Sequence, residues 1–154
     1  MVGLWVVVGV LVVGLVFGVV SRARNGRVRV TADKPGHSLP EPVSALLDQA
    51  ADVTLVQIST TFCAPCRHAK AVLTALADKT DGLRHVELDV TEQPEVAQSL
   101  GILRTPTTLA LTGDGRELLR IGGVPKGTAL LDALRPHLPQ FAAALPDPGN
   151  RPKE

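Results

Sequence analysis

Hydrophobic residues follow three patterns along this chain. Residues 2–20 form an uncharged, almost entirely apolar run. Short segments typical of strands, which are rich in β-branched residues as at 53–59 or alternate between apolar and polar residues as at 83–90, occupy 53–59, 83–90, 107–111 and 117–121. Apolar residues at helical spacing recur in 43–50, 72–77, 94–100 and 130–134. The pattern predicts an α/β domain preceded by an apolar helix.

The apolar run is long enough to cross a membrane. A helix of about twenty residues spans a bilayer core of about 30 Å, so we predict a single-pass transmembrane anchor over 2–21. A secretory signal peptide fits less well, because no Lys or Arg precedes the run, no Ala-x-Ala site follows it and its apolar core is long. A buried core helix also fits less well, because the segment is apolar on every face.

Four arginines follow the run and set its expected orientation: Arg22, Arg24, Arg27 and Arg29. The positive-inside bias places them, and the domain after them, on the cytoplasmic side of the cell membrane. The same side chains can contact anionic head groups. An extracytoplasmic domain is the alternative, and its electrons would have to cross the membrane.

Composition shifts divide the rest of the chain. Residues 22–42 are expected to be a basic juxtamembrane segment with a short edge strand at Val28 to Val30 and a proline-containing linker. Residues 43–138 form the predicted domain, in which strands 53–59 and 83–90 are joined by a crossover helix and should be parallel. The proline-rich end, 139–154, is predicted to be disordered.

Charge and aromatic content narrow the functional classes. The chain has 16 Lys plus Arg and 15 Asp plus Glu, for a net charge of +1. So balanced a chain argues against nucleic acid as a general partner. Aromatic residues make up only 3% of the chain, so the core must be aliphatic.

Both cysteines, Cys63 and Cys66, lie where a buried strand gives way to a helix. The first helical turn presents unpaired N–H groups and the positive end of the macrodipole, which would stabilise a thiolate at Cys63. Arg67 and Lys70 add positive charge, and Pro65 fits the first turn because its missing N–H costs little there. A loop this short removes little entropy from the unfolded chain, so the pair is predicted to be reactive rather than structural.

A metal site is the main competing interpretation of the cysteine pair. Tetrahedral zinc requires four N or S ligands, and none of the four histidines has a compelling spacing from the cysteines. Haem attachment would require a histidine where Arg67 stands. We therefore predict redox chemistry and no metal. The histidines are His37, His68, His85 and His137.

The succession of strand, Cys-x-x-Cys and helix resembles the thioredoxin family, over about Val53 to Leu138. The resemblance implies a thioredoxin fold, with a central mixed sheet flanked by helices in the order βαβαββα. It implies that Cys63 is the exposed nucleophile and Cys66 the more buried resolving thiol. No cofactor is then required beyond the redox-active disulfide that these two residues form.

The resemblance also implies a substrate-binding surface. Pro106 matches the family's cis-proline, and the residue before it pairs with substrate like an added strand. Gly122 matches a glycine that lets the last strand pass close beneath substrate, and Phe62 stands where many members have tryptophan. Each also has a plain structural interpretation, as a strand-start proline, a strand-ending glycine and a surface side chain. The expected substrate-binding residues are Phe62, Ala64, Pro65, Thr105, Pro106 and Gly122.

Three positions depart from the family pattern. Gln57 stands where classical thioredoxins have a buried Asp that accepts the proton of the resolving cysteine, and Glu87 stands where they have a Lys. Our hypothesis is that Glu87, on the neighbouring strand, accepts the proton from Cys66. The alternative is an exposed carboxylate on a polar strand face. Ala64 replaces the usual glycine of the spacer, where residues tune the reduction potential.

The sequence thus predicts a membrane-anchored thiol-disulfide oxidoreductase that reduces or exchanges protein disulfides. Its expected partners are protein disulfide substrates, the lipid bilayer, and a reductase or a membrane electron donor. Two other functions remain open at this point. One is a membrane-tethered thiol module that binds a soft metal such as Cu(I), and the other is a non-catalytic interaction domain with the thioredoxin fold.

Overall fold

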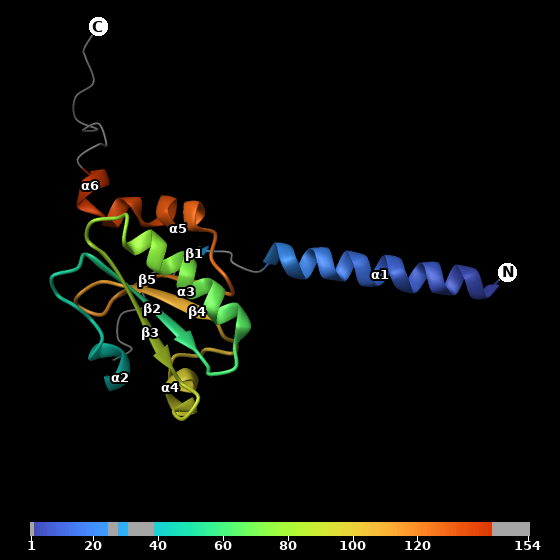
Figure 1. The fold of residues 1–154 in the computed structure, drawn as a ribbon, viewed down its shortest axis with the longest axis horizontal. Coiled ribbons are helices and arrows are strands. Elements are labelled where there is room, and N and C mark those ends of the chain that lie inside the picture. Colours follow the sequence, from blue (N-terminus) through green and yellow to red (C-terminus); the bar gives the residue numbers. More distant parts are fainter. Residues whose placement is uncertain (1, 25–27, 31–38, 143–154) are drawn as a thin grey trace, which may run out of the picture.

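A computed structural model describes residues 2–24, 28–30 and 39–142 of the chain. Its elements are shown in Figure 1. In chain order they are α1 (Val2–Arg24), β1 (Val28–Val30), α2 (Glu41–Ser44), β2 (Val53–Ser59), α3 (Ala64–Ala77), β3 (Leu83–Asp89), α4 (Pro94–Ser99), β4 (Thr107–Leu111), β5 (Glu117–Gly122), α5 (Gly127–Leu134), the 3-10 helix η1 (Arg135–His137) and α6 (Pro139–Ala142).

Five strands form one mixed sheet in the order β1-β5-β4-β2-β3. Strands β2 and β3 run parallel, as predicted, because α3 carries the chain from one to the other. The other neighbours are antiparallel, including the predicted edge strand β1 against β5. In this register Gln57 of β2 lies opposite Glu87 of β3 and Thr108 of β4. These three residues share one face of the sheet, because directly paired side chains lie on the same face.

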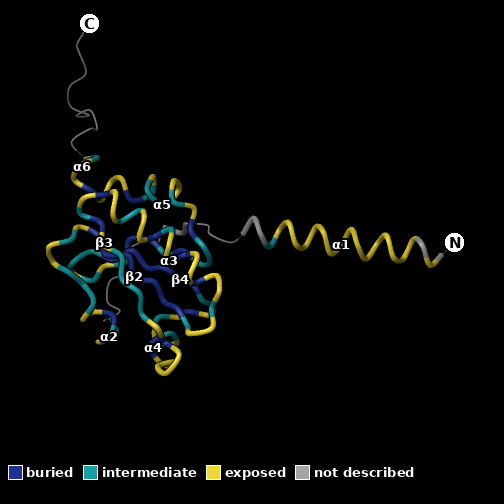
Figure 2. Tube along the Cα trace, viewed as in Figure 1, coloured by how far each residue is buried: buried dark blue, intermediate teal, exposed yellow. Residues whose placement is uncertain are grey.

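Helices cover both faces of the sheet (Figure 1). One core cluster joins the sheet to helices α3 and α5. The other joins the sheet to helices α2 and α4. Successive residues of β2 point to opposite faces, so Leu55 belongs to the first cluster and Ile58 to the second. Both are fully buried, and burying such a side chain contributes about 1.5–3 kcal/mol. Figure 2 shows that burial is concentrated in the central strands of the sheet, β2 and β4 among them. These strands fix the position of the residues that follow β2.

Helix α1 extends away from the sheet (Figure 1) and is exposed along most of its described length (Figure 2). Its exposed large hydrophobic side chains include Trp5 and Phe17. The predicted apolar helix is therefore present and continues to Arg24. Within the described residues, however, no helix reaches the combination of length and apolarity that crossing a bilayer demands. The transmembrane anchor predicted over 2–21 is thus not confirmed by the structure.

Helix α2 is shorter than the sequence pattern predicted. It ends at Ser44, and the chain continues in turns in which the N–H of Leu47 donates to the carbonyl O of Ser44. The Asp48 carboxylate accepts a hydrogen bond from the N–H of Ala50 at 2.9 Å, a local side-chain contact that competes with helical hydrogen bonding. Of the apolar residues predicted to form one helix face, Val43, Leu46 and Leu47 pack in the core without a continuous helix, whereas Ala50 is exposed.

The segment predicted to be a disordered tail begins with helix α6. Phe141 packs against the core cluster beneath α3 and α5, which gives this turn a reason to be ordered. Prolines do interrupt the closing helix as expected, since α5 ends at Leu134 and η1 contains Pro136. The rest of the predicted tail, 143–154, and the linker over 31–38 lie outside the described residues.

Candidate active site

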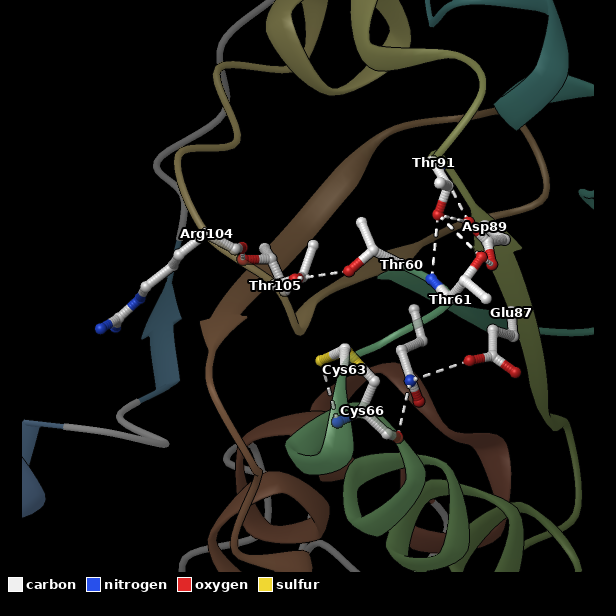
Figure 3. The surroundings of a disulfide bond; sticks show 11 residues. Thr60, Thr61, Cys63, Cys66, Glu87, Asp89, Thr91, Arg104 and Thr105 are labelled. Carbon is white, nitrogen blue, oxygen red and sulfur yellow. Dashed lines mark hydrogen bonds between the residues drawn. A yellow bond between two sulfur atoms is a disulfide. The ribbon is translucent and has the colours of Figure 1, made fainter.

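The two cysteines form a disulfide at the start of α3, with their Cα atoms 5.2 Å apart (Figure 3). Cys63 is the N-cap residue of the helix and is partly exposed. Cys66 lies in the first turn and is 2% exposed. The structure therefore places the two sulfurs in the unequal environments that the resemblance implied.

The helix terminus is directed at the sulfur of Cys63. The backbone N–H of Cys66 donates to Cys63 Sγ at 3.1 Å. Pro65 also lies in this first turn, where a missing N–H leaves no helical bond unmade. In the reduced protein the same N–H and the positive end of the helix dipole would favour a thiolate on Cys63.

The segment before Pro106 faces the disulfide from the other side. The Thr105–Pro106 peptide bond is cis, as the resemblance implied, and Pro106 is buried. Thr105 Oγ1 lies 3.4 Å from Thr60 Oγ1, close to the disulfide (Figure 3). The N–H of Gly123 donates to the carbonyl O of Pro106 at 2.7 Å, which holds the end of β5 against this segment.

Gln57 connects the central strand to the active-site helix. Its side chain is fully buried, and Nε2 donates to the carbonyl O of Cys66 at 3.0 Å. The same nitrogen donates to Oε1 of Glu87 at 3.4 Å. A neutral amide thus takes the place next to the resolving cysteine, and the nearest carboxylate lies one strand further along the sheet.

Glu87 is also engaged from the side of α3. Lys70 Nζ lies 2.8 Å from Glu87 Oε2. The positive charge of Lys70, which the sequence suggested would act on Cys63, is therefore paired with this carboxylate instead. Partial burial raises the pKa of Glu87, but the hydrogen bonds from Lys70 and Ser59 and the charges of Lys70 and His85 outweigh burial and hold that pKa below its usual value. Glu87 is therefore a carboxylate at neutral pH.

The outer surface beside the disulfide carries two exposed hydrophobic side chains. Phe62 is 96% exposed and Leu103 is 98% exposed. Gly122 lies at the end of β5, where a Cβ would be 2.8 Å from Nη2 of Arg104, so a side chain here would require Arg104 to move. Of the other expected substrate-binding residues, Ala64 and Pro65 are exposed.

Several residues at the site were not singled out from the sequence. Leu103 and Arg104 precede Thr105 directly, and this adjacency was the signal that could have drawn attention to them. Thr61 hydrogen bonds to residues at the end of β3, a contact that only the fold reveals. In the part of the chain that the structure describes, no group of three or more His, Cys, Asp or Glu is arranged to hold a metal ion.

Comparisons with known proteins agree with this geometry. The Thioredoxin family model matches residues 41–136. Thioredoxin H2 from Arabidopsis thaliana is 38% identical over 72 residues, and the match covers 47% of this chain and 53% of that protein. Thioredoxin 1 from Nostoc sp. is 33% identical over 85 residues, covering 54% of this chain and 78% of the relative.

A solved structure supports the same assignment. The crystal structure of thioredoxin NaTrxh from Nicotiana alata is 30% identical, with a TM-score of 0.50, and the match covers 63% of this chain and 80% of that one. The residues that the family model matches contain the disulfide, the cis-proline and strands β2 to β5. The chain therefore belongs to the thioredoxin family, thiol-disulfide oxidoreductases whose chemistry uses the protein's own disulfide and no further cofactor.

Proposed function

We propose that this protein reduces or exchanges protein disulfides through Cys63 and Cys66. The Cys63 thiolate attacks one sulfur of a substrate disulfide, forming a mixed disulfide and releasing the first substrate thiolate, which takes up a proton. Cys66 then loses its proton and attacks Cys63 Sγ. The Cys63–Cys66 disulfide forms, the second substrate thiol leaves, and two electrons have passed to the substrate.

One observation carries this proposal: the sulfur of Cys63 lies at the N-terminus of α3 and accepts the N–H of Cys66, while Cys66 itself is buried. The outer sulfur is open to a substrate and the inner one is within bonding reach of it. A Cys66→Ser variant should accumulate a covalent mixed disulfide between Cys63 and the substrate, which is detectable by mass under non-reducing conditions. A Cys63→Ser variant that traps substrate in this way would contradict the assignment of the nucleophile.

We further propose that Glu87 accepts the proton that Cys66 loses. The carboxylate is ionised at neutral pH, and Gln57 contacts both this carboxylate and the backbone of Cys66. A base is useful only within hydrogen-bond reach of the proton or one water away from it. Gln57 lies between Glu87 and Cys66, so in this proposal the proton reaches Glu87 by way of a water rather than directly from Cys66.

The substrate is proposed to bind in extended form along the backbone of Thr105. Strand-like pairing with an exposed backbone provides affinity without requiring a particular sequence. Phe62 supplies exposed apolar surface on one side of the disulfide, and Gly122 lies at the end of β5, where Arg104 packs against it. Ala64, Pro65 and Pro106 complete the surface that we assign to substrate.

We also propose membrane attachment through α1, with the domain on the cytoplasmic side. The support is the uncharged sequence of residues 2–20, the exposure of its large hydrophobic side chains, and the arginines that follow it. A reductase would then return electrons to the Cys63–Cys66 disulfide. An extracytoplasmic domain would instead need a membrane electron donor, and labelling of Cys63 with an impermeant thiol reagent in intact cells distinguishes the two.

A further inference from the structure

Two consecutive threonines hold the loop that leads from β2 to Cys63, and they do so in different directions. Thr60 Oγ1 lies 3.4 Å from Thr105 Oγ1, on the side of the cis-proline. Thr61 hydrogen bonds to the end of β3 instead (Figure 3). The loop is thereby held between the cis-proline segment and the end of β3.

The contacts of Thr61 with Asp89 and Thr91, which we call the Thr61 brace, are the more extensive. The N–H of Thr61 donates to Thr91 Oγ1 at 2.9 Å, and Thr61 Oγ1 donates to Asp89 Oδ2 at 3.2 Å. Thr91 is in turn fixed to Asp89, because its N–H and its hydroxyl donate to Asp89 Oδ1 at 2.8 and 2.5 Å. Both carboxylate oxygens and both threonine hydroxyls are therefore used.

The charge state of Asp89 suits this arrangement. The hydrogen bonds from the Thr91 side chain and backbone, with a smaller contribution from Thr61, lower the pKa of Asp89 below its usual value despite the opposing effect of burial. The acceptor of the brace is consequently ionised at neutral pH, and hydrogen bonds to an ionised acceptor are stronger than neutral ones.

Packing does not hold the residues that follow Thr61. Phe62 is 96% exposed, so its side chain contributes little to fixing this part of the loop. The backbone is fixed at Thr61 by the brace and at Cys63, whose N–H donates to the carbonyl O of Thr60 at 3.2 Å. Thr61 therefore anchors the loop between the buried strand and the reactive sulfur.

We infer that Thr61, Asp89 and Thr91 are positioning residues that set the placement of Phe62 and Cys63 against a docked protein disulfide. This inference rests on the proposed thiol-disulfide exchange. In-line attack of one sulfur on another requires a narrow geometry, and a displacement of about 1 Å can cost about 100-fold in rate. A small reagent needs no docking, so its reaction with Cys63 should be much less sensitive to the brace.

The chain contains a matched control for this brace. Thr112 Oγ1 donates to Asp114 Oδ1, and Thr112 also accepts the N–H of Arg116, in the turn between β4 and β5. This pair has the same chemistry as Thr91 and Asp89. It lies at the opposite end of β4 from the cis-proline, because Thr107 begins that strand and Leu111 ends it.

The test compares insulin reduction and iodoacetamide alkylation of Cys63 in reduced full-length protein. For Thr61→Val and Asp89→Asn we expect kcat/KM for insulin to fall by about 10-fold, which is less than the loss of about 100-fold that a displacement of about 1 Å can cause. The rate of alkylation of Cys63 should change by less than about 2-fold. Thr61→Ser, which keeps the hydroxyl, should restore insulin reduction. Asp114→Asn should resemble the unsubstituted protein in both assays.

Three results would overturn the inference: unchanged kcat/KM in Thr61→Val and Asp89→Asn, an equal loss in Asp114→Asn, or a Thr61→Ser variant as slow as Thr61→Val. Circular dichroism of each variant at the assay temperature establishes that folded proteins are compared. If the unsubstituted protein does not reduce insulin at all, the proposed function itself is contradicted, and the inference falls with it.

Discussion

Gln57 and Cys66 are joined by a buried hydrogen bond, in which Nε2 of the amide donates to the carbonyl O of the cysteine at 3.0 Å. The same nitrogen is 3.4 Å from Glu87 Oε1. The central strand thus contacts the active-site helix through a neutral group, and the negative charge lies on the neighbouring strand beside Lys70. A buried carboxylate next to Cys66 would carry a large desolvation cost, which this arrangement avoids.

Replacing Glu87 by Gln should slow the resolution of the mixed disulfide. The amide is nearly the same size but cannot accept a full proton, so we expect a loss of about 100-fold, the lower end of the 100-fold to 10,000-fold range typical of acid–base groups. Stopped-flow measurement of resolution against pH checks this, with the exposed Glu95→Gln on α4 as the control. An identical pH profile for Glu87→Gln and the unsubstituted protein would remove Glu87 from the reaction.

The core should be sensitive to truncation and the exposed rim should not. Leu55 is fully buried in the cluster beneath α3, so Leu55→Ala should lower the free energy of unfolding by about 2–5 kcal/mol. Leu103 is 98% exposed, and Leu103→Ala should change the free energy of unfolding by no more than about 0.5 kcal/mol. Urea denaturation of both variants measures the difference. Equal effects would mean that the packing described for β2 is wrong.

Stability should fall as the pH drops below 6.5, the ordinary value for histidine, because of His85. Burial lowers the pKa of His85, and the charge of Lys70 adds to this while that of Glu87 opposes it. The unfolded chain then takes up a proton at a higher pH than the folded protein does, so protonation favours unfolding. Above that value the residue is neutral in both states and contributes no pH dependence.

Unfolding free energies at about pH 7.5 and about pH 5.5 test this expectation. The decrease between the two should be smaller in His85→Gln than in the unsubstituted protein. A decrease that is the same in both proteins would show that His85 does not titrate differently on folding.

Charges introduced into α1 should release the protein from membranes, if α1 attaches it as we propose. Arg in the centre of an apolar helix costs about 2.5–3.5 kcal/mol for insertion, so the double variant Leu11→Arg and Leu15→Arg should move from the membrane fraction to the supernatant after carbonate extraction. Leu103→Arg is the matched control on the domain and should leave the distribution unchanged. Membrane attachment is contradicted if the unsubstituted protein is already in the supernatant.

The sequence was most informative where one physical signal determined one element. The segment 53–59, rich in β-branched residues, predicted β2 with its correct bounds, because a strand buried on both faces needs no alternation. The alternation over 83–90 placed Glu87 and Val86 on opposite faces of β3, as the structure has them. The cysteine spacing predicted a reactive pair at a helix start, and the disulfide lies there.

Other features depended on contacts between distant parts of the chain. Backbone hydrogen bonds hold the turn after Ser44, and the Asp48 side chain holds the next turn, contacts that apolar spacing alone does not reveal. Order at Phe141 results from packing against helices far away in sequence. The pairing of Lys70 with Glu87 and the hydrogen bonds of Thr61 likewise require the register of β3 against α3 and β2.

The reduction of insulin by dithiothreitol, followed by the precipitation of the freed chains, tests the central proposal most directly. The unsubstituted protein should accelerate precipitation in proportion to its concentration, because reduced Cys63 attacks insulin and Cys66 releases the product. The Cys63→Ser variant should give the rate of dithiothreitol alone. A rate equal to that background for the unsubstituted protein, or an undiminished rate for Cys63→Ser, would contradict the proposed function.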